Sequence, residues 1–166
     1  MTATFTIART VNAPLTRVWR AWTQESELAQ WFGPKGCPIF QSALDFRPGG
    51  TFHYGLRFPT GMEIWGLWTF EEMHDSASFS FLSGFSDPAG KDYTRNPWSA
   101  TWPLKSHTVV TFKKVTETTT EVTLTATPHD APPEEVATFT EGHASMTQGW
   151  GGTFEQFEAF LAQNPS

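Results

Sequence analysis

The spacing of apolar residues predicts the order of elements along the chain: a strand, two short helices, a series of strands and one long helix. Phe5, Ile7 and Val11 stand at even spacing with threonines between them. This alternation is typical of a strand that buries one face. We therefore expect the first strand to cover residues 2–11.

Two short helices are predicted next, because the apolar spacing changes from two to three and four. The first lies in "NAPLTRVWRAW", with Pro14 in its first turn and Asn12 or Ala13 near its cap. Its apolar face consists of Leu15, Val18, Trp19 and Trp22. The second covers residues 25–32 and ends at "GPKG". It carries Leu28, Trp31 and Phe32.

From residue 40 the spacing returns to two, which predicts several more strands. The turns "RPGG" and "PTG" are short, so neighbouring strands should pair antiparallel in a meander. Together with the first strand, the chain should hold about seven strands. The alternating apolar positions are Phe40, Leu44, Phe46, Phe52, Tyr54, Leu56, Phe58, Met62, Ile64, Trp68, Phe70, Phe79, Phe81, Phe85, Val110, Phe112, Val122, Leu124 and Ala126.

One stretch, "SDPAGKDYTRNPWSATWPLKS" at residues 86–106, has no clear period. Insertions of this length in compact domains are usually functional loops or disordered segments. Tyr93, Trp98 and Trp102 argue against disorder, because large aromatic rings favour burial. Two alternatives stay open: part of the loop packs back over an opening, or the loop folds down to shield a sheet edge.

The final helix begins at "APPEE" and should run unbroken over residues 133–162, a length of ~45 Å that requires it to lie across the sheet. Gly149, Gly151 and Gly152 crowd around Trp150, although each glycine inside a helix costs about 1 kcal/mol relative to alanine. We favour close backbone approach and helix bending as their role over ligand contact. The continuous apolar face comprises Val136, Phe139, His143, Met146, Trp150, Phe154, Phe157 and Leu161.

Composition and charge narrow the classes of function. The 166 residues suit one domain, residues 1–166, with a net charge of -6 and no basic run, so neither nucleic acid nor a membrane surface is an expected partner. The chain has neither a signal-peptide core nor a membrane span, and its single cysteine, Cys37, fits a reducing compartment. We therefore expect a cytoplasmic protein. Its 15 Phe and 8 Trp exceed what a compact core of this size usually needs, so some are expected to line a cavity.

The sequence offers little catalytic chemistry. Its five histidines have no metal-ligand spacing, and there is no GxSxG, P-loop or GxGxxG, so we expect no metal and no cofactor. His53, Arg57 and Glu63 alternate out of phase with the apolar rows, which places them on the outer face of the sheet. His143 lies on the apolar face of the last helix, where a hydrogen-bonded core histidine is the usual case. We therefore assign no catalytic residue.

The order of elements is that of the helix-grip fold, in which a bent antiparallel sheet wraps a long carboxy-terminal helix. Four stretches of the chain carry a family resemblance: "VNAPLTRVWRAWTQESELAQWFGP", "FRPGGTFHYGL", "NPWSATWPL" and "MTQGWGGTFEQFEAFL". In these stretches the sequence resembles the START-like (SRPBCC) superfamily and, within it, the AHSA-type domains named for the activator of heat-shock protein 90 ATPase. This resemblance implies an α+β fold, often with a cavity between sheet and helix.

We expect a small hydrophobic or amphipathic ligand to bind in that cavity. The alternatives are an enzyme of cyclase or hydratase type acting in the same place, a chaperone-activating partner, which we favour least, or aromatic rings that fill the space themselves. Trp65 and Leu67 on the outer face form a candidate surface for a homodimer. The expected ligand-binding residues are Trp31, Phe40, Tyr54, Ile64, Trp68, Phe81, Met146, Trp150 and Phe154.

Overall fold

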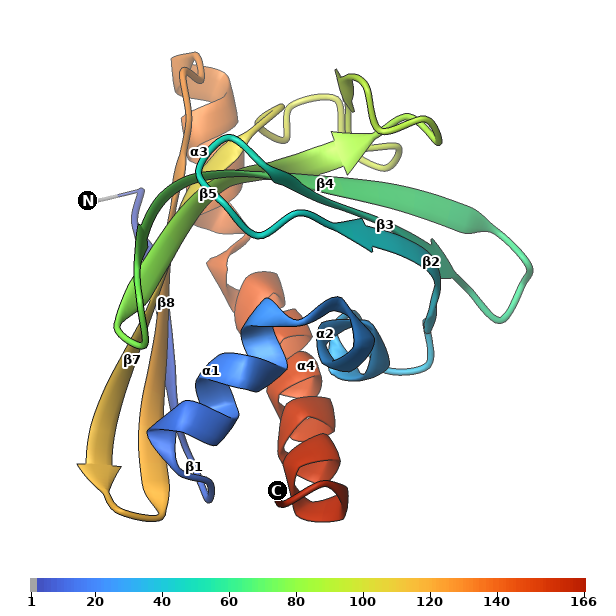
Figure 1. Cartoon of the computed structure of the whole chain (residues 1–166). Coiled ribbons are helices and arrows are strands. Elements are labelled where there is room, and N and C mark those ends of the chain that lie inside the picture. Colours follow the sequence, from blue (N-terminus) through green and yellow to red (C-terminus); the bar gives the residue numbers. More distant parts are fainter. Residues whose placement is uncertain (1–2) are drawn as a thin grey trace.

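The computed structural model, which describes residues 3–166, has a strongly bent antiparallel sheet with helices packed inside the bend (Figure 1). The α+β helix-grip fold expected from the sequence is thereby confirmed. In chain order the elements are β1 (Phe5–Val11), α1 (Leu15–Thr23), α2 (Glu25–Trp31), β2 (Ile39–Leu44), β3 (Thr51–Arg57), β4 (Glu63–His74), β5 (Ser78–Ser86), β6 (Tyr93–Thr94), β7 (Ser106–Thr116), β8 (Thr119–Pro128), α3 (Pro133–Glu141) and α4 (His143–Gln163).

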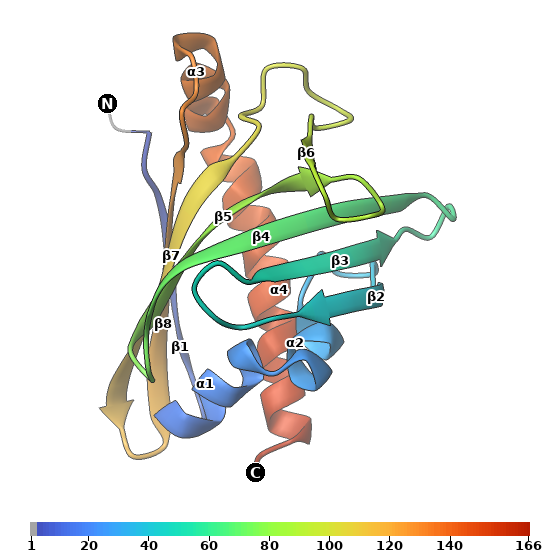
Figure 2. The ribbon, with the colours of Figure 1, turned by 45° about the horizontal axis from the view of Figure 1, so that its top comes forward.

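The sheet is ordered β1-β8-β7-β5-β4-β3-β2, and the two-residue β6 adds to β5. All of these pairings are antiparallel. Strands β2 to β5 form one arm of the bend, and β7, β8 and β1 form the other (Figure 2). Helix α4 runs along the inner face, and α1 with α2 closes the end of the angle near the carboxy terminus.

The prediction of one unbroken helix over residues 133–162 is wrong, because the helix is interrupted at Gly142. The Gly142 N–H donates to the carbonyls of Thr138 and Phe139, and the next helix begins at His143. A Cβ at Gly142 would lie 2.9 Å from the Trp102 ring, which therefore occupies the space beside this residue. The break lets α3 pack beside the 86–106 loop while α4 crosses the sheet.

Close approach does not explain the three glycines around Trp150, contrary to our expectation. A Cβ built at Gly149 or Gly151 meets no atom within 4 Å, and one at Gly152 meets only the Lys35 Cβ, at 4.0 Å. No neighbouring backbone therefore requires a glycine at these positions. The three glycines still lower the helix propensity of α4 at this point. Gly149 borders the cavity.

We expect Gly151→Ala to stabilise the fold by about 1 kcal/mol, because alanine restricts the unfolded chain and its methyl group meets no neighbour here. The midpoint of urea denaturation, followed by far-UV circular dichroism, measures the change. Gly142→Ala is the matched control and should destabilise, since its methyl group would press on Trp102. A loss of stability in Gly151→Ala would contradict the prediction.

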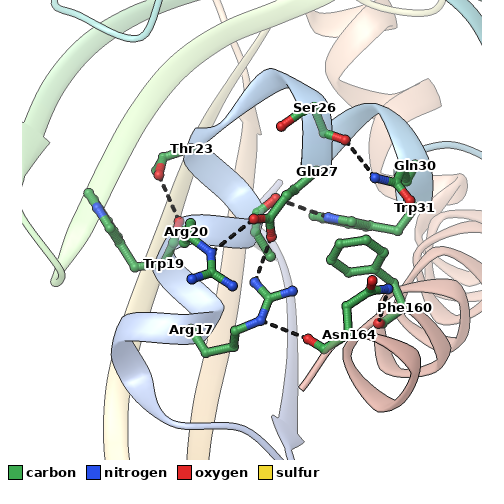
Figure 3. A network of polar contacts seen from close by, with 11 residues as sticks. Arg17, Trp19, Arg20, Thr23, Ser26, Glu27, Gln30, Trp31, Phe160 and Asn164 are labelled. Carbon is green, nitrogen blue, oxygen red and sulfur yellow. Dashed lines mark hydrogen bonds and ion pairs between the residues drawn. The ribbon is translucent and has the colours of Figure 1, made fainter. Parts of the chain in front are cut away.

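A polar network ties the two short helices to the end of α4 (Figure 3). The Arg17 Nη1 donates to Glu27 Oε1 at 2.6 Å, and its Nε donates to the Asn164 carbonyl at 2.9 Å. Arg20 Nε donates to the other Glu27 oxygen at 2.9 Å. The Arg17 guanidinium also lies over the Phe160 ring, 5.3 Å from its centre. One arginine thereby joins α1, α2 and α4.

Candidate functional site: a cavity between sheet and helix

A cavity of about 390 Å³, partly open to solvent, lies between the inner face of the sheet and the first half of α4. Strands β3, β4, β5, β7 and β8 supply its floor, and Met146, Gly149 and Trp150 of α4 supply one wall. Trp98, Trp102 and Pro103 of the 86–106 loop also line it. Trp31, Phe154 and Phe157 belong to the buried core cluster that adjoins it.

Six of the nine residues expected to bind a ligand line this cavity: Tyr54, Ile64, Trp68, Phe81, Met146 and Trp150. Trp68 and Phe81 come from adjacent strands and stack with 4.1 Å between ring centres. Trp150 approaches from α4, and its ring packs against Phe32 at 5.9 Å. The alternating apolar rows of β3 to β5 therefore do converge on one space.

Trp31 and Phe154 do not line the cavity, contrary to expectation, because they belong to the core beneath it. Trp31 is 1% exposed, packs 4.4 Å from the Phe157 ring and donates its Nε1 proton to the Ala21 carbonyl. Phe154 is fully buried one turn below Trp150, where the Arg9 guanidinium lies over its ring. These rings fill the lower half of the angle between sheet and helix.

Phe40 lies on the opposite face of the sheet, so its predicted inward direction is wrong. A β-bulge between Ile39 and Gln41 shifts the register of β2 against β3. A bulge adds one residue to a strand and reverses the faces on either side of it. The Phe40 ring consequently packs on Trp65 at 5.2 Å and under the Arg57 guanidinium at 4.2 Å.

Several lining residues were not expected. Phe32 follows the last residue of α2 with an extended backbone, and its ring contacts Tyr54 and Trp68 at 5.2 and 5.0 Å. Phe58 and Phe85 extend the apolar rows already recognised in the sequence. Trp98 lies against both of them and is 60% exposed, so it stands at the mouth.

The 86–106 loop combines both alternatives for its role, because β6 pairs with β5 along the edge that β7 leaves uncovered beyond Ser83, and a later part of the loop lines the cavity. Its first part folds over the outer face, where Tyr93 Oη lies 2.6 Å from Thr69 Oγ1 and Gly90 abuts His53. Its second part reaches the cavity and is held to α3 by the Arg95–Glu135 ion pair at 2.7 Å.

The outer surface suggested for a homodimer is largely occupied by the chain itself. Leu67 is only 4% exposed. Trp65 is stacked on His53 at 4.9 Å and packed by Phe40. These two side chains therefore form no open apolar patch, and self-association stays a prediction without a surface assigned to it.

The lining carries no formal charge: none of the Asp, Glu, Lys, Arg or His side chains of residues 3–166 faces this cavity. Besides the tryptophans, its polar side chains are those of Tyr54, Ser83, Ser106, Thr108 and Thr153, which carry hydroxyls. Burial raises the pKa of the Tyr54 phenol well above its usual value, partly offset by a hydrogen bond with Trp68. Tyr54 therefore stays protonated and neutral at physiological pH.

The histidine and cysteine candidates lie elsewhere. The His143 ring sits between Phe5 and Phe139 at the start of α4, and its buried Nε2 has no hydrogen-bond partner among residues 3–166. Cys37 is a buried free thiol beside α2. Over the same range, no three His, Cys, Asp or Glu side chains are grouped to hold a metal ion. Nor is any helix there long and apolar enough to span a membrane.

A family model described as activator of Hsp90 ATPase homolog 1-like protein matches residues 12–162. The chain belongs to this family. The match includes every cavity-lining element, from α2 to the first half of α4. No curated protein matches the sequence.

Solved bacterial structures share the family fold over nearly the whole chain. A protein from Arthrobacter aurescens is 25% identical, with 97% of this chain and 87% of that one covered and a TM-score of 0.79. One from Mycobacterium smegmatis is 29% identical, with 96% and 91% covered and a TM-score of 0.76. The AHSA1 protein of Silicibacter pomeroyi, at 16% identity, covers 96% and 98% with a TM-score of 0.73 and supports the fold alone.

Proposed function

We propose that this AHSA1-family protein binds a small, uncharged hydrophobic or amphipathic molecule in the cavity between the sheet and α4. The observation that carries the proposal is a cavity of about 390 Å³ beside a buried core of aromatic and aliphatic side chains. Ligand pockets are typically about 300–1,000 Å³, mostly apolar, with a few polar groups that fix orientation. This cavity has that size and that lining.

Binding is favoured over catalysis because the cavity lacks acid–base groups. A cyclase or hydratase needs a carboxylate, histidine or comparable group within reach of its substrate. Within residues 3–166 the one titratable side chain that lines the cavity is Tyr54. Its raised pKa suits a hydrogen-bond donor and does not suit a general base near neutral pH.

The mouth of the cavity supports reversible entry of a ligand. Trp98 is exposed over more than half of its surface, and its ring lies against Phe58 and Phe85. The segment that carries it is anchored at Arg95, which donates to the Trp102 carbonyl and pairs with Glu135. These contacts hold the ends of the segment, while most of the Trp98 side chain faces solvent.

We expect Ala126→Leu to weaken binding of the neutral probe N-phenyl-1-naphthylamine at least about tenfold, because the larger side chain would occupy part of the cavity floor. Titration of probe fluorescence gives the dissociation constant. Ala8→Leu is the matched control, since it makes the same change at an exposed position of β1 outside the cavity. Equal affinities of both variants and the unsubstituted protein, or no probe binding at all, would overturn the proposal.

A further inference from the structure

A row of hydroxyls interrupts the apolar lining where strands β4, β5 and β7 adjoin. Ser83 of β5 is the cross-strand partner of Ser106 on β7, and Thr108 lies two residues further along β7, opposite Phe81. All three residues line the cavity. Because side chains two apart on a strand share a face, the three hydroxyls stand next to one another on the cavity floor.

Thr108 is set apart from the other buried hydroxyl residues by its lack of a partner. It is 4% exposed, and no hydrogen bond from its side chain to residues 3–166 is found, although the fully enclosed side-chain atoms that lack a partner in this range are Trp22 Nε1 and His143 Nε2. The other buried Ser and Thr hydroxyls are each hydrogen-bonded within the chain: those of Ser80, Ser86, Thr120 and Thr153. The Thr108 hydroxyl is not among those enclosed atoms and its residue lines the cavity, so it is open to the cavity and suited to a partner there.

Tyr54 brings a fourth hydroxyl toward the row by lying across Gly66. A Cβ at Gly66 would stand 2.3 Å from the tyrosine Cζ and 2.4 Å from Oη, so only a glycine leaves room for this ring. Gly66 is paired with Phe85 on β5, two residues from Ser83. The phenol therefore extends from β3 over β4 toward β5, and its raised pKa keeps the proton available for donation.

We infer that the hydroxyls of Tyr54, Ser83, Ser106 and Thr108 recognise the carbonyl oxygen of an uncharged ligand whose flat apolar body lies among the surrounding rings. A carbonyl oxygen accepts hydrogen bonds from hydroxyls and adds no net charge. An ionised group would lose its hydration with no opposite charge to replace it, because the lining has none. The inference rests on the proposed binding function. It specifies that a carbonyl oxygen of the ligand is recognised, and that the cavity hydroxyls recognise it.

The test compares three probes of one shape: 2-acetylnaphthalene, which carries a ketone, 2-ethylnaphthalene, which lacks it, and the charged 2-naphthoate. Their dissociation constants are measured by quenching of tryptophan fluorescence. Thr108→Val keeps the shape of the side chain and removes its hydroxyl, and Tyr54→Phe does the same for the phenol. Thr111→Val, on the exposed face of the same strand, is the matched control.

We expect Thr108→Val and Tyr54→Phe each to weaken binding of the ketone about three- to tenfold and to leave binding of the hydrocarbon unchanged. Thr111→Val should alter neither affinity, and 2-naphthoate should bind more weakly than the ketone. Unchanged ketone affinity in both variants, or naphthoate binding as tight as ketone binding, overturns this inference while the binding function stands. If 2-acetylnaphthalene, 2-ethylnaphthalene and N-phenyl-1-naphthylamine all fail to bind the unsubstituted protein, this inference and the proposed binding function are both overturned.

Discussion

Trp31→Ala should lower the free energy of unfolding by about 3 to 5 kcal/mol, a large part of the stability of a typical domain. The Trp31 side chain is 1% exposed and lies between Trp22, at 4.8 Å, and Phe157, at 4.4 Å. Its removal leaves a void that these rings cannot close, and it also removes the hydrogen bond to the Ala21 carbonyl. Urea denaturation followed by circular dichroism measures the loss.

Trp150→Ala should be compared with Trp31→Ala, because Trp31 is surrounded by the core and Trp150 borders the cavity. The Trp150 ring contacts Phe32 and Phe154, at 5.9 and 6.0 Å, and otherwise borders the cavity. We therefore expect its truncation to cost less than half as much stability as that of Trp31, on the general dependence of cost on the void created. Equal losses would indicate that Trp150 is packed on all sides and that no hollow adjoins it.

The periodicity of the sequence was sufficient for the fold because large apolar side chains alternate along the strands that face α4, even where the outer face is also covered, as at Leu67. Even spacing in Phe52, Tyr54 and Leu56 and in Ile64 and Trp68 predicted both the strands and the direction of their side chains. Phe40 was misplaced because a bulge inserts one residue without a distinctive sequence signal. The helix break at Gly142 was missed because apolar spacing continues across it, and the Trp102 ring that packs beside Gly142 lies in a distant loop.

The depth of the cavity depends on geometry that local patterns do not specify. Trp31 and Phe32 are adjacent apolar residues, and only the end of α2 between them sends one ring into the core and the other into the cavity. Trp98 and Trp102 line the cavity only because the 86–106 loop folds back over the sheet. The Arg95–Glu135 ion pair holds the loop in this position. The hydroxyl of Thr108 was overlooked because an inward threonine in a strand has no signal of its own.

The Arg17 network joins α1, α2 and α4 beneath the cavity, beside the aromatic packing of Trp31, and we expect Arg17→Ala to cost about 3 to 5 kcal/mol of stability. Arg17 is 5% exposed, and its partner Glu27 is also largely shielded, at 16%. Without the arginine, Glu27 keeps only the more exposed Arg20, and the Asn164 carbonyl loses its donor. Urea denaturation at low and high salt measures the loss, which should persist in salt because buried pairs are weakly screened.

Two further variants separate the charge of Arg17 from its packing. Arg20→Ala, at the exposed side of the same carboxylate, should cost no more than about 1 kcal/mol, as surface ion pairs do. Arg17→Met keeps much of the contact with Phe160 and leaves Glu27 without its buried partner, so adding Glu27→Leu to it should restore part of the lost stability. If Arg17→Ala and Arg20→Ala proved equally mild, the network would be a surface feature and the helices would depend on apolar packing alone. Recovery of stability in the Arg17→Met, Glu27→Leu variant would show that Arg17→Met destabilises mainly by leaving the Glu27 carboxylate without its partner. We expect this result because Glu27 is largely shielded from solvent.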